Sequence, residues 1–139
     1  MKKNFILASH GSMAKGVYEA AEIITGGKEN VSIYCAYTDG KENNVAEEVE
    51  ELLKKIPKNE EIIVMTDLYG GSVNTAFVKQ VDNYNLHLIA GMNLPLVLLM
   101  LENNEDDTVK MIESGIHWAA ENVKYCNKTI KNLTQEDNF

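Results

Sequence analysis

The chain has 139 residues, of which 45% are hydrophobic and 24% charged, a composition typical of one globular domain with its own core. Its formal net charge of -8 at pH 7 argues against a nucleic acid or an anionic membrane as primary partner and favours a basic protein. The late apolar run over residues 94–101 is far shorter than the ~20 residues of a membrane span, and residues 1–3 do not lead into a secretion signal. We therefore expect a cytoplasmic protein.

Strands and amphipathic helices alternate in the first half of the chain. The apolar run 5–8 has the length of a buried strand, and the small polar residues 9–12 lead from it into a stripe at helical spacing. Residues 31–37 are rich in β-branched and aromatic side chains and predict a second strand, which the turn 38–40 ends. A second helical stripe follows over residues 45–56. Glutamates occupy its opposite side, which we expect to face solvent.

The alternation continues past the middle of the chain. Residues 62–66 predict a third strand, and a polar loop over 67–72 separates it from a helical pattern over 74–80. Residues 85–90 predict a fourth strand, which ends in the loop 91–95. Each of these strands is therefore followed by a loop that contains glycine, the arrangement typical of a strand that leads into a helix.

The last third predicts two helices and a strand. Residues 96–101 are apolar on every side, so we expect this helix to be covered by the core and by a subunit contact. After the acidic loop 102–107, an apolar stripe predicts a helix over 108–123. Residues 123–130 predict a fifth strand, and the polar residues 131–139 predict a flexible tail.

This order of elements predicts an α/β fold with three layers, in which helices cover both faces of a doubly wound, mainly parallel sheet. We expect the strand order 2-1-3-4 and a single domain over residues 1–130, which includes the strand 123–130. In such sheets, ligands bind beyond the carboxyl ends of the strands, at the point where the strand order reverses. That point lies between strands one and three.

Two polar residues stand on either side of this point. His10 follows the first strand and Asp67 follows the third. Because neighbouring strands are ~4.8 Å apart, the two side chains can meet at hydrogen-bonding distance. A carboxylate bonded to one ring nitrogen fixes the histidine tautomer and stabilises the cation that forms when the other nitrogen attacks. The pair therefore predicts a nucleophilic His10 that Asp67 orients.

The residues around this pair favour phosphate. Small residues and hydroxyls follow both strands, and two helices begin just beyond, which makes a cradle for an anion; the candidate phosphate-binding residues are Gly11, Ser12, Gly71 and Ser72. Neither loop contains Lys or Arg, and no second carboxylate stands beside Asp67 to hold Mg²⁺. This argues against a nucleotide kinase and favours a transient phosphoryl group, with no metal and no cofactor.

The remaining histidines and the cysteines carry no such pattern. We expect His87 to lie on a face of the sheet and His117 on a helix surface. Cys35 and Cys126 lie far apart, outside any Cys-x-x-Cys pair or histidine cluster, so their spacing indicates neither a zinc site nor a disulfide framework. Buried free thiols are the simplest interpretation.

Three loops, in order, carry a resemblance to a known family. They are Ala-Ser-His-Gly over 8–11, followed by Ala14 and Gly16; Thr-Asp-Leu-Tyr-Gly-Gly-Ser-Val-Asn over 66–74; and Gly-Met-Asn-Leu-Pro over 91–95. These are similar to the loops of the IIA component (EIIA, type 4) of the mannose/fructose/sorbose family of the bacterial phosphoenolpyruvate-dependent sugar phosphotransferase system. The family often has proline where this chain has Val73; this removes no functional group.

The resemblance implies a phosphotransferase component with a phosphohistidine intermediate. The histidine matching His10 accepts a phosphoryl group from the phosphocarrier HPr and passes it to the IIB component, which phosphorylates the sugar during transport through the membrane IIC/IID permease. The aspartate matching Asp67 orients the imidazole, and the serine matching Ser72 contacts the phosphate. The family fold also implies a homodimer that exchanges a fifth, antiparallel strand, for which residues 123–130 are the candidate. The sugar stays open, as does peripheral association with the permease.

Three other functions stay open at this stage. A IIA-like phosphocarrier domain that serves dihydroxyacetone kinase shares the fold and the histidine. A receiver-type signalling domain is phosphorylated on an aspartate after its third strand, the position of Asp67, but it has an acidic pair where this chain has Ser9-His10. A Ser-His-Asp hydrolase would use Ser12 or Ser72, yet no G-x-S-x-G elbow exposes either serine.

Overall fold

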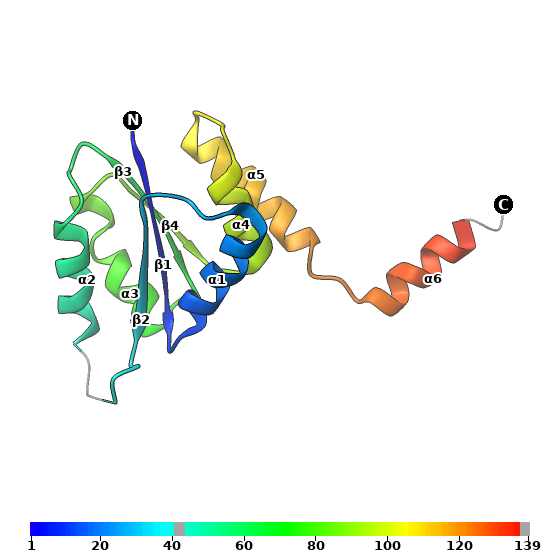
Figure 1. Cartoon of the computed structure of the whole chain (residues 1–139), viewed down its shortest axis with the longest axis horizontal. Helices are drawn as coiled ribbons and strands as arrows, with labels where there is room; N and C mark the ends of the chain where they lie inside the picture. Colours follow the sequence, from blue (N-terminus) through cyan, green and yellow to red (C-terminus); the bar gives the residue numbers. More distant parts are fainter. Residues whose placement is uncertain (41–43, 137–139) are drawn as a thin grey trace.

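A four-stranded parallel sheet forms the middle of the molecule in the computed structural model, which describes residues 1–40 and 44–136 (Figure 1). The strands are β1 (Lys3–His10), β2 (Val31–Ala36), β3 (Glu61–Thr66) and β4 (Leu86–Ala90). Their order is β2-β1-β3-β4, and each neighbouring pair is parallel. The predicted order is confirmed, and the reversal point lies between β1 and β3.

Helices cover both faces of the sheet, as predicted. One face is covered by α1 (Met13–Thr25), α4 (Leu94–Glu102) and α5 (Thr108–Glu121), and the other by α2 (Val45–Lys54) and α3 (Ser72–Val78) (Figure 1). A short 3₁₀ helix, Val81–Asn83, precedes β4. Each of these five α-helices lies close to the element predicted from its apolar stripe, with ends that differ by a few residues.

The side chains of the strands alternate between two cores. In β1, Phe5 and Leu7 pack under α1, α4 and α5, while Ile6 and Ala8 pack under α2 and α3. All four are buried. Because both faces are covered, the strands read as continuous apolar runs rather than as alternating patterns. This rigid double core fixes where the strands end, and so where the polar residues after them lie.

The apolar helix α4 obtains its cover largely within the chain. Leu96, Val97, Met100 and Leu101 are buried, against the sheet, α1 and α5. A side chain at Gly115 of α5 would meet Met100 of α4, so glycine permits the close approach of the two helices. Leu98 and Leu99 stay partly exposed. The predicted core position of this helix is confirmed, and its subunit contact stays a prediction.

The C-terminal segment differs from the prediction. Residues 123–130 do not form a strand: α6 (Cys126–Glu136) is a helix that projects away from the body of the molecule (Figure 1). Its apolar residues Cys126, Ile130 and Leu133 recur at helical spacing, and a helix satisfies its backbone groups internally, whereas a strand needs a neighbour. The predicted tail covers residues 131–139. Residues 131–136 belong to a helix instead, and residues 137–139 lie outside the described residues.

The two cysteines differ in their exposure. Cys35 is partly buried and Cys126 is exposed, both as free thiols, so the expectation of buried thiols is wrong for Cys126.

Along the described residues, 1–40 and 44–136, no helix combines the length and the apolar character needed to cross a bilayer.

Candidate functional site

The structure brings His10 and Asp67 together at the carboxyl ends of β1 and β3. Ala8 of β1 lies opposite Thr66 of β3, so both strands end at the same edge of the sheet. One carboxylate oxygen, Asp67 Oδ2, lies 2.9 Å from His10 Nδ1 and accepts a second hydrogen bond, of 2.8 Å, from the backbone N–H of His10. Asp67 therefore holds both the ring and the backbone of His10.

The electrostatics of the pair favour an ionised carboxylate. Burial alone would raise the pKa of Asp67, but the hydrogen bonds from the backbone and ring of His10, and the charge of that ring, outweigh burial and hold the pKa below its ordinary value. An ionised carboxylate can only accept, so the neutral form of the His10 imidazole carries its N–H on Nδ1. Nε2 is then left with a lone pair, on a side chain that is 41% exposed.

Ser72 lies on the Nε2 side of the ring. It is the first residue of α3, and its Oγ is 3.2 Å from His10 Nε2. Asp67, at 11% side-chain exposure, and Ser72 thus contact opposite nitrogens of one imidazole. Three residues that the sequence predicts for the site, from β1, the β3 loop and α3, form one continuous chain of contacts.

The predicted glycines have a steric part in the site. A Cβ atom at Gly71 would lie 3.2 Å from His10 Cε1 and 3.3 Å from the backbone oxygen of Leu68, so a larger residue would press on the imidazole. The N–H groups of Gly11 and Gly71 already donate to the carbonyls of Ala36 and Leu68. Phosphate binding by these two glycines stays a prediction.

Ser12 stands at the amino end of α1, where it is exposed and makes no side-chain capping bond. The neighbouring Ser9 does the local structural work: its buried Oγ accepts from the N–H of Ala14 at 2.7 Å and donates to the carbonyl of Gly11 at 3.0 Å. The loop after β1 is therefore held by Ser9. The predicted contact of Ser12 with phosphate stays a prediction.

A buried asparagine supports the second loop, and the sequence analysis assigned it no role. Asn74 donates through Nδ2 to Thr66 Oγ1 at 3.0 Å and accepts through Oδ1 from the N–H of Gly70 at 3.1 Å. It ties the end of β3 to α3, and so fixes Asp67 relative to Ser72. The third motif loop is tied to the same strand end, because Gly91 and Met92 donate to the carbonyl of Thr66.

Tyr37 is a member of the site that the sequence analysis missed. It follows β2, which neighbours β1, and its hydroxyl lies 2.9 Å from Ser72 Oγ. Its ring lies 5.8 Å from that of His10 between centroids, at an angle of 31°. The signal was present in the sequence: β2 was predicted to end near this residue, beside the strand that carries His10. A residue after β2 therefore reaches the same edge.

The other histidines have structural partners away from this edge. His87, in β4, lies 3.6 Å from Glu61, and His117 pairs with Glu121 one turn further along α5. Both placements agree with the predictions of a sheet face and a helix surface. Within residues 1–40 and 44–136, no cluster of His, Cys, Asp and Glu has the arrangement of a metal site.

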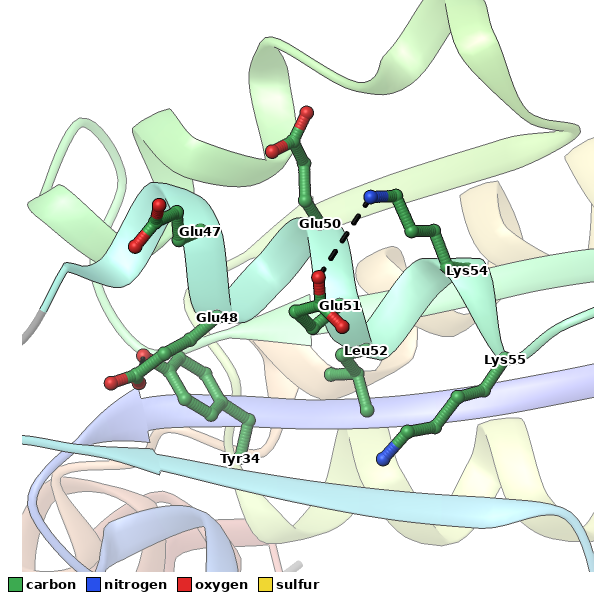
Figure 2. A pocket seen from close by; sticks show the side chains of 8 residues that line it. All are labelled: Tyr34, Glu47, Glu48, Glu50, Glu51, Leu52, Lys54 and Lys55. Carbon is green, nitrogen blue, oxygen red and sulfur yellow. Dashed lines mark hydrogen bonds and ion pairs between the residues drawn. The ribbon is translucent and has the colours of Figure 1, made fainter.

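A separate hollow of about 700 Å³ lies over α2 and β2 (Figure 2). It is lined by four glutamates, Leu52 and Lys54 of α2, by Lys55 directly after that helix, and by Tyr34 of β2. Burial, together with a hydrogen bond to Glu48, raises the pKa of Tyr34. None of the residues that contact His10 lines this hollow. Its acidic side chains form the solvent-facing side of α2 that the sequence predicts.

Comparison with known proteins identifies the family. The family model described as "PTS system fructose IIA component" matches residues 4–114. The chain belongs to this family. The assignment covers the body of the fold and all the residues of the site, and it does not favour a dihydroxyacetone kinase domain or a receiver domain.

Individual relatives agree with this assignment. The chain is 24% identical to the fructose-specific EIIA component of Bacillus subtilis, over 95% of this chain and 96% of that protein. It is 27% identical to the mannose-specific EIIAB component of Escherichia coli K12, over 73% of this chain and 32% of that protein. This member of the mannose-family IIA components therefore matches only part of the two-component EIIAB chain.

Solved structures show the same fold. A Klebsiella pneumoniae protein described as a phosphoenolpyruvate-dependent sugar phosphotransferase system permease superimposes with a TM-score of 0.88 at 39% identity, over 94% of this chain and 95% of that one. The mannose/sorbose-specific IIA subunit from Enterococcus faecalis gives 0.77 at 21% identity, over 89% and 94%. The second match shows likeness of fold alone.

Proposed function

We propose that this IIA component is a phosphocarrier that accepts a phosphoryl group on His10 from HPr and passes it to a IIB component. One observation carries the proposal: Asp67 binds Nδ1 of His10 and leaves Nε2, beside the Ser72 hydroxyl, on an exposed face of the ring. An imidazole held in this way is prepared for nucleophilic attack through one defined nitrogen.

The transfer step follows from this tautomer. The lone pair of His10 Nε2 attacks the phosphorus of the donor phosphohistidine, an N–P bond forms, and the donor nitrogen leaves with the electron pair of the old N–P bond. The His10 ring becomes cationic while its Nδ1 proton stays on the hydrogen bond to Asp67, whose negative charge stabilises it. Transfer to the IIB histidine is the same step in the opposite direction.

The bound phosphoryl group would lie between the amino ends of α1 and α3. The first N–H groups of a helix lack internal partners, and the helix dipole favours an anion there. We assign Ser72 the direct hydrogen bond, since its hydroxyl already contacts Nε2. We assign the second hydrogen bond to the phosphoryl group to the hydroxyl of Ser12, at the start of α1. Gly11 and Gly71 shape the loops around the phosphoryl group.

The surface around His10 suits protein partners. Exposed apolar side chains lie on both sides of it: Met13, the first residue of α1, is 44% exposed, and Leu68 and Tyr69, in the loop after β3, are 60% and 86% exposed. Apolar side chains grouped around a polar centre are typical of protein–protein contacts. We propose that HPr and IIB dock here in turn, that the chain is cytoplasmic, and that it reaches the membrane IIC/IID permease only through IIB. In this scheme the sugar is selected elsewhere in the permease.

We also propose that the protein is a homodimer whose contact includes the C-terminal segment. α6 projects from the body, and Val123, Tyr125 and Leu133 are 77%, 73% and 56% exposed (Figure 1). An isolated helix of this length is marginal in water without packing. A second copy of the chain supplies that packing in this proposal. Leu133→Asp should therefore convert a dimer to a monomer in sedimentation equilibrium, whereas Lys131→Asp should not; an unchanged dimer of Leu133→Asp would contradict the proposal.

Labelling tests the phosphocarrier function. With phosphoenolpyruvate, enzyme I and HPr, we expect one phosphoryl group per chain in the wild type and none in His10→Ala, while His117→Ala keeps the label. The label should survive base and be lost in acid, as a phosphohistidine does; an acyl phosphate on Asp67 would be lost in base. Labelling of the His10→Ala protein would contradict the assignment of His10 as the phosphorylated residue.

One alternative has a geometric observation in its favour. The contacts Ser72–His10–Asp67 have the order of a hydrolase triad, with distances of 3.2 Å and 2.9 Å. Membership of the IIA family favours the phosphocarrier. The two functions separate cleanly in an ester-hydrolysis assay: turnover abolished by Ser72→Ala would support the hydrolase, and we expect no turnover above that of His10→Ala.

A further inference from the structure

We propose that Tyr37 is a positioning residue for phosphoryl transfer, which acts by holding the hydroxyl of Ser72 against His10. The proposal rests on the proposed function of His10 and adds a residue to it. Tyr37 lies outside the three motif loops, directly after β2 (Val31–Ala36). It reaches the site because the end of β2 lies beside the end of β1, with Ala36 opposite His10.

A single chain of contacts runs through the site. Asp67 Oδ2 lies 2.9 Å from His10 Nδ1, Ser72 Oγ lies 3.2 Å from His10 Nε2, and the Tyr37 hydroxyl lies 2.9 Å from Ser72 Oγ. These residues come from three separate segments of the chain: the end of β1, the residue after β2, and the stretch that joins β3 to α3. Tyr37 is thus the outermost member, and it contacts Ser72 on the side away from the imidazole nitrogen.

The direction of each hydrogen bond follows from the first. Because the carboxylate of Asp67 only accepts, the neutral imidazole of His10 has its N–H on Nδ1, and Nε2 is an acceptor. The Ser72 hydroxyl therefore donates its one proton to Nε2. The contact between the two hydroxyls then requires Tyr37 to donate to Ser72 Oγ. Tyr37 fixes the rotation of the serine hydroxyl, so the serine points at the nitrogen that is to be phosphorylated.

This arrangement has a function during transfer. When the phosphoryl group approaches Nε2, the Ser72 hydroxyl must give up its hydrogen bond to the Nε2 lone pair and donate to a phosphoryl oxygen instead. The Tyr37 hydrogen bond to Ser72 Oγ persists through that rotation, because it uses the oxygen lone pair and not the proton. Ser72 Oγ stays in place while its proton changes partner, which keeps the reacting groups oriented. The Ser72 proton is redirected and none is consumed.

Two further observations agree with a positioning role. The Tyr37 backbone has a φ of +64°, in the left-handed region that a bulky residue rarely adopts. Such conformations persist where the surrounding contacts enforce them, and they cluster at functional sites. The Tyr37 ring also lies at a tilt beside the imidazole, 5.8 Å between centroids, so its position is coupled to that of His10 as well as to Ser72.

A double-mutant cycle tests this coupling. Tyr37→Phe keeps the ring and removes the hydroxyl; we expect the transfer rate from phospho-HPr to fall about three- to tenfold, the range for one lost hydrogen bond, with the KM for HPr unchanged. In a Ser72→Ala background the same change should have no further effect, because Tyr37 acts through Ser72. Tyr34→Phe, which changes a tyrosine within β2 that is bonded to Glu48, should keep the wild-type rate. Additive effects, or a wild-type rate in Tyr37→Phe, would overturn the proposal.

A measurement without phosphoryl transfer keeps the two proposals separate. In the unphosphorylated protein, we expect the ¹⁵N resonance of His10 Nε2 to move in Tyr37→Phe toward the value of an imidazole nitrogen without a hydrogen bond, and to be unchanged in Tyr34→Phe. An unchanged resonance in Tyr37→Phe would overturn the role of Tyr37. A wild-type protein that takes no label on His10 would instead overturn the phosphocarrier function.

Discussion

Two polar regions of this molecule look similar in composition and differ in construction. At the carboxyl edge of the sheet, three segments of the chain supply four residues that contact one another in series: Asp67, His10, Ser72 and Tyr37. Over α2, the glutamates of the hollow come from a single helix and point mainly to solvent, with one ion pair of 3.8 Å between Glu51 and Lys54 (Figure 2).

The difference shows what makes a site. The hollow over α2 is large and charged, but an exposed ion pair within one helix contributes little, because water competes for both partners. At the sheet edge, separate elements fix each side chain, so the tautomer of His10 and the exposed face of its ring are both determined. Volume and charge alone would have selected the hollow. Mutual contacts between elements select the sheet edge.

The strongest test of this comparison is the Asp67→Asn substitution. An amide can present its NH₂ group to Nδ1 and stabilise the wrong tautomer, and it carries no charge to balance the cationic ring. By analogy with hydrolytic triads, we expect phosphoryl transfer to slow by on the order of 10²- to 10⁴-fold. Rapid-quench transfer from labelled HPr measures the rate, and circular dichroism checks the fold. If transfer kept its wild-type rate, the orienting role of Asp67 would have to be withdrawn.

A smaller effect is expected from Gly71→Ala. The added Cβ would lie 3.2 Å from His10 Cε1, so the imidazole must shift by a few tenths of an ångström. Misplacement of a reacting group slows the reaction steeply, and we expect transfer to fall roughly three- to tenfold. Gly16→Ala, whose Cβ meets nothing within 4 Å, is the matched control. Equal rates for the two variants would show that the ring tolerates this contact.

The His10–Asp67 contact should also appear in the pH dependence of stability. The pKa of Asp67 in the folded protein is below its ordinary value of 3.8. The stabilisation from this group is therefore complete above that ordinary value and is lost as pH falls through the lower, folded-state pKa. We expect urea unfolding between pH 2 and 6 to show that the difference in the free energy of unfolding between wild type and Asp67→Asn narrows only at the acid end of this range. A gap that stays constant throughout would contradict the lowered pKa.

The smallest effects should come from the other region. Glu50→Gln and Glu51→Gln change exposed side chains of α2, so we expect the free energy of unfolding to stay within about 0.5 kcal/mol of wild type, and the rate of phosphoryl transfer to be unchanged. Thermal unfolding and the HPr assay measure both. A large loss of transfer in either variant would show that the face of α2 takes part in function, and would break the comparison.

Much of the site can be predicted from the sequence because its residues directly follow elements that the local pattern predicts. His10 and Asp67 each come directly after a strand with a clear apolar pattern, and the strand order then places them side by side. Ser72 begins a helix at a loop that the glycines mark. The contact of Tyr37 was missed because a strand end is a weak signal by itself, and its importance depends on the position of Ser72.

The C-terminal segment was predicted incorrectly for a related reason. Residues 123–130 contain β-branched and aromatic side chains next to a helical repeat of apolar positions, so both structures are compatible with the pattern. A strand is stable only with a neighbour, which the sequence of one segment cannot supply. The structure places a helix there, α6, which satisfies its own backbone.

The sequence by itself determined the alternation of strands and helices, the polar residues at the strand ends and the family resemblance, because these depend on hydrophobic period and on motifs that are contiguous in the chain. Only the tertiary structure decided that one oxygen of Asp67 holds both the ring and the backbone of His10, that Ser72 faces Nε2, and that the Tyr37 hydroxyl contacts Ser72. These contacts join segments far apart in sequence, and their distances depend on the packing of two cores against one sheet.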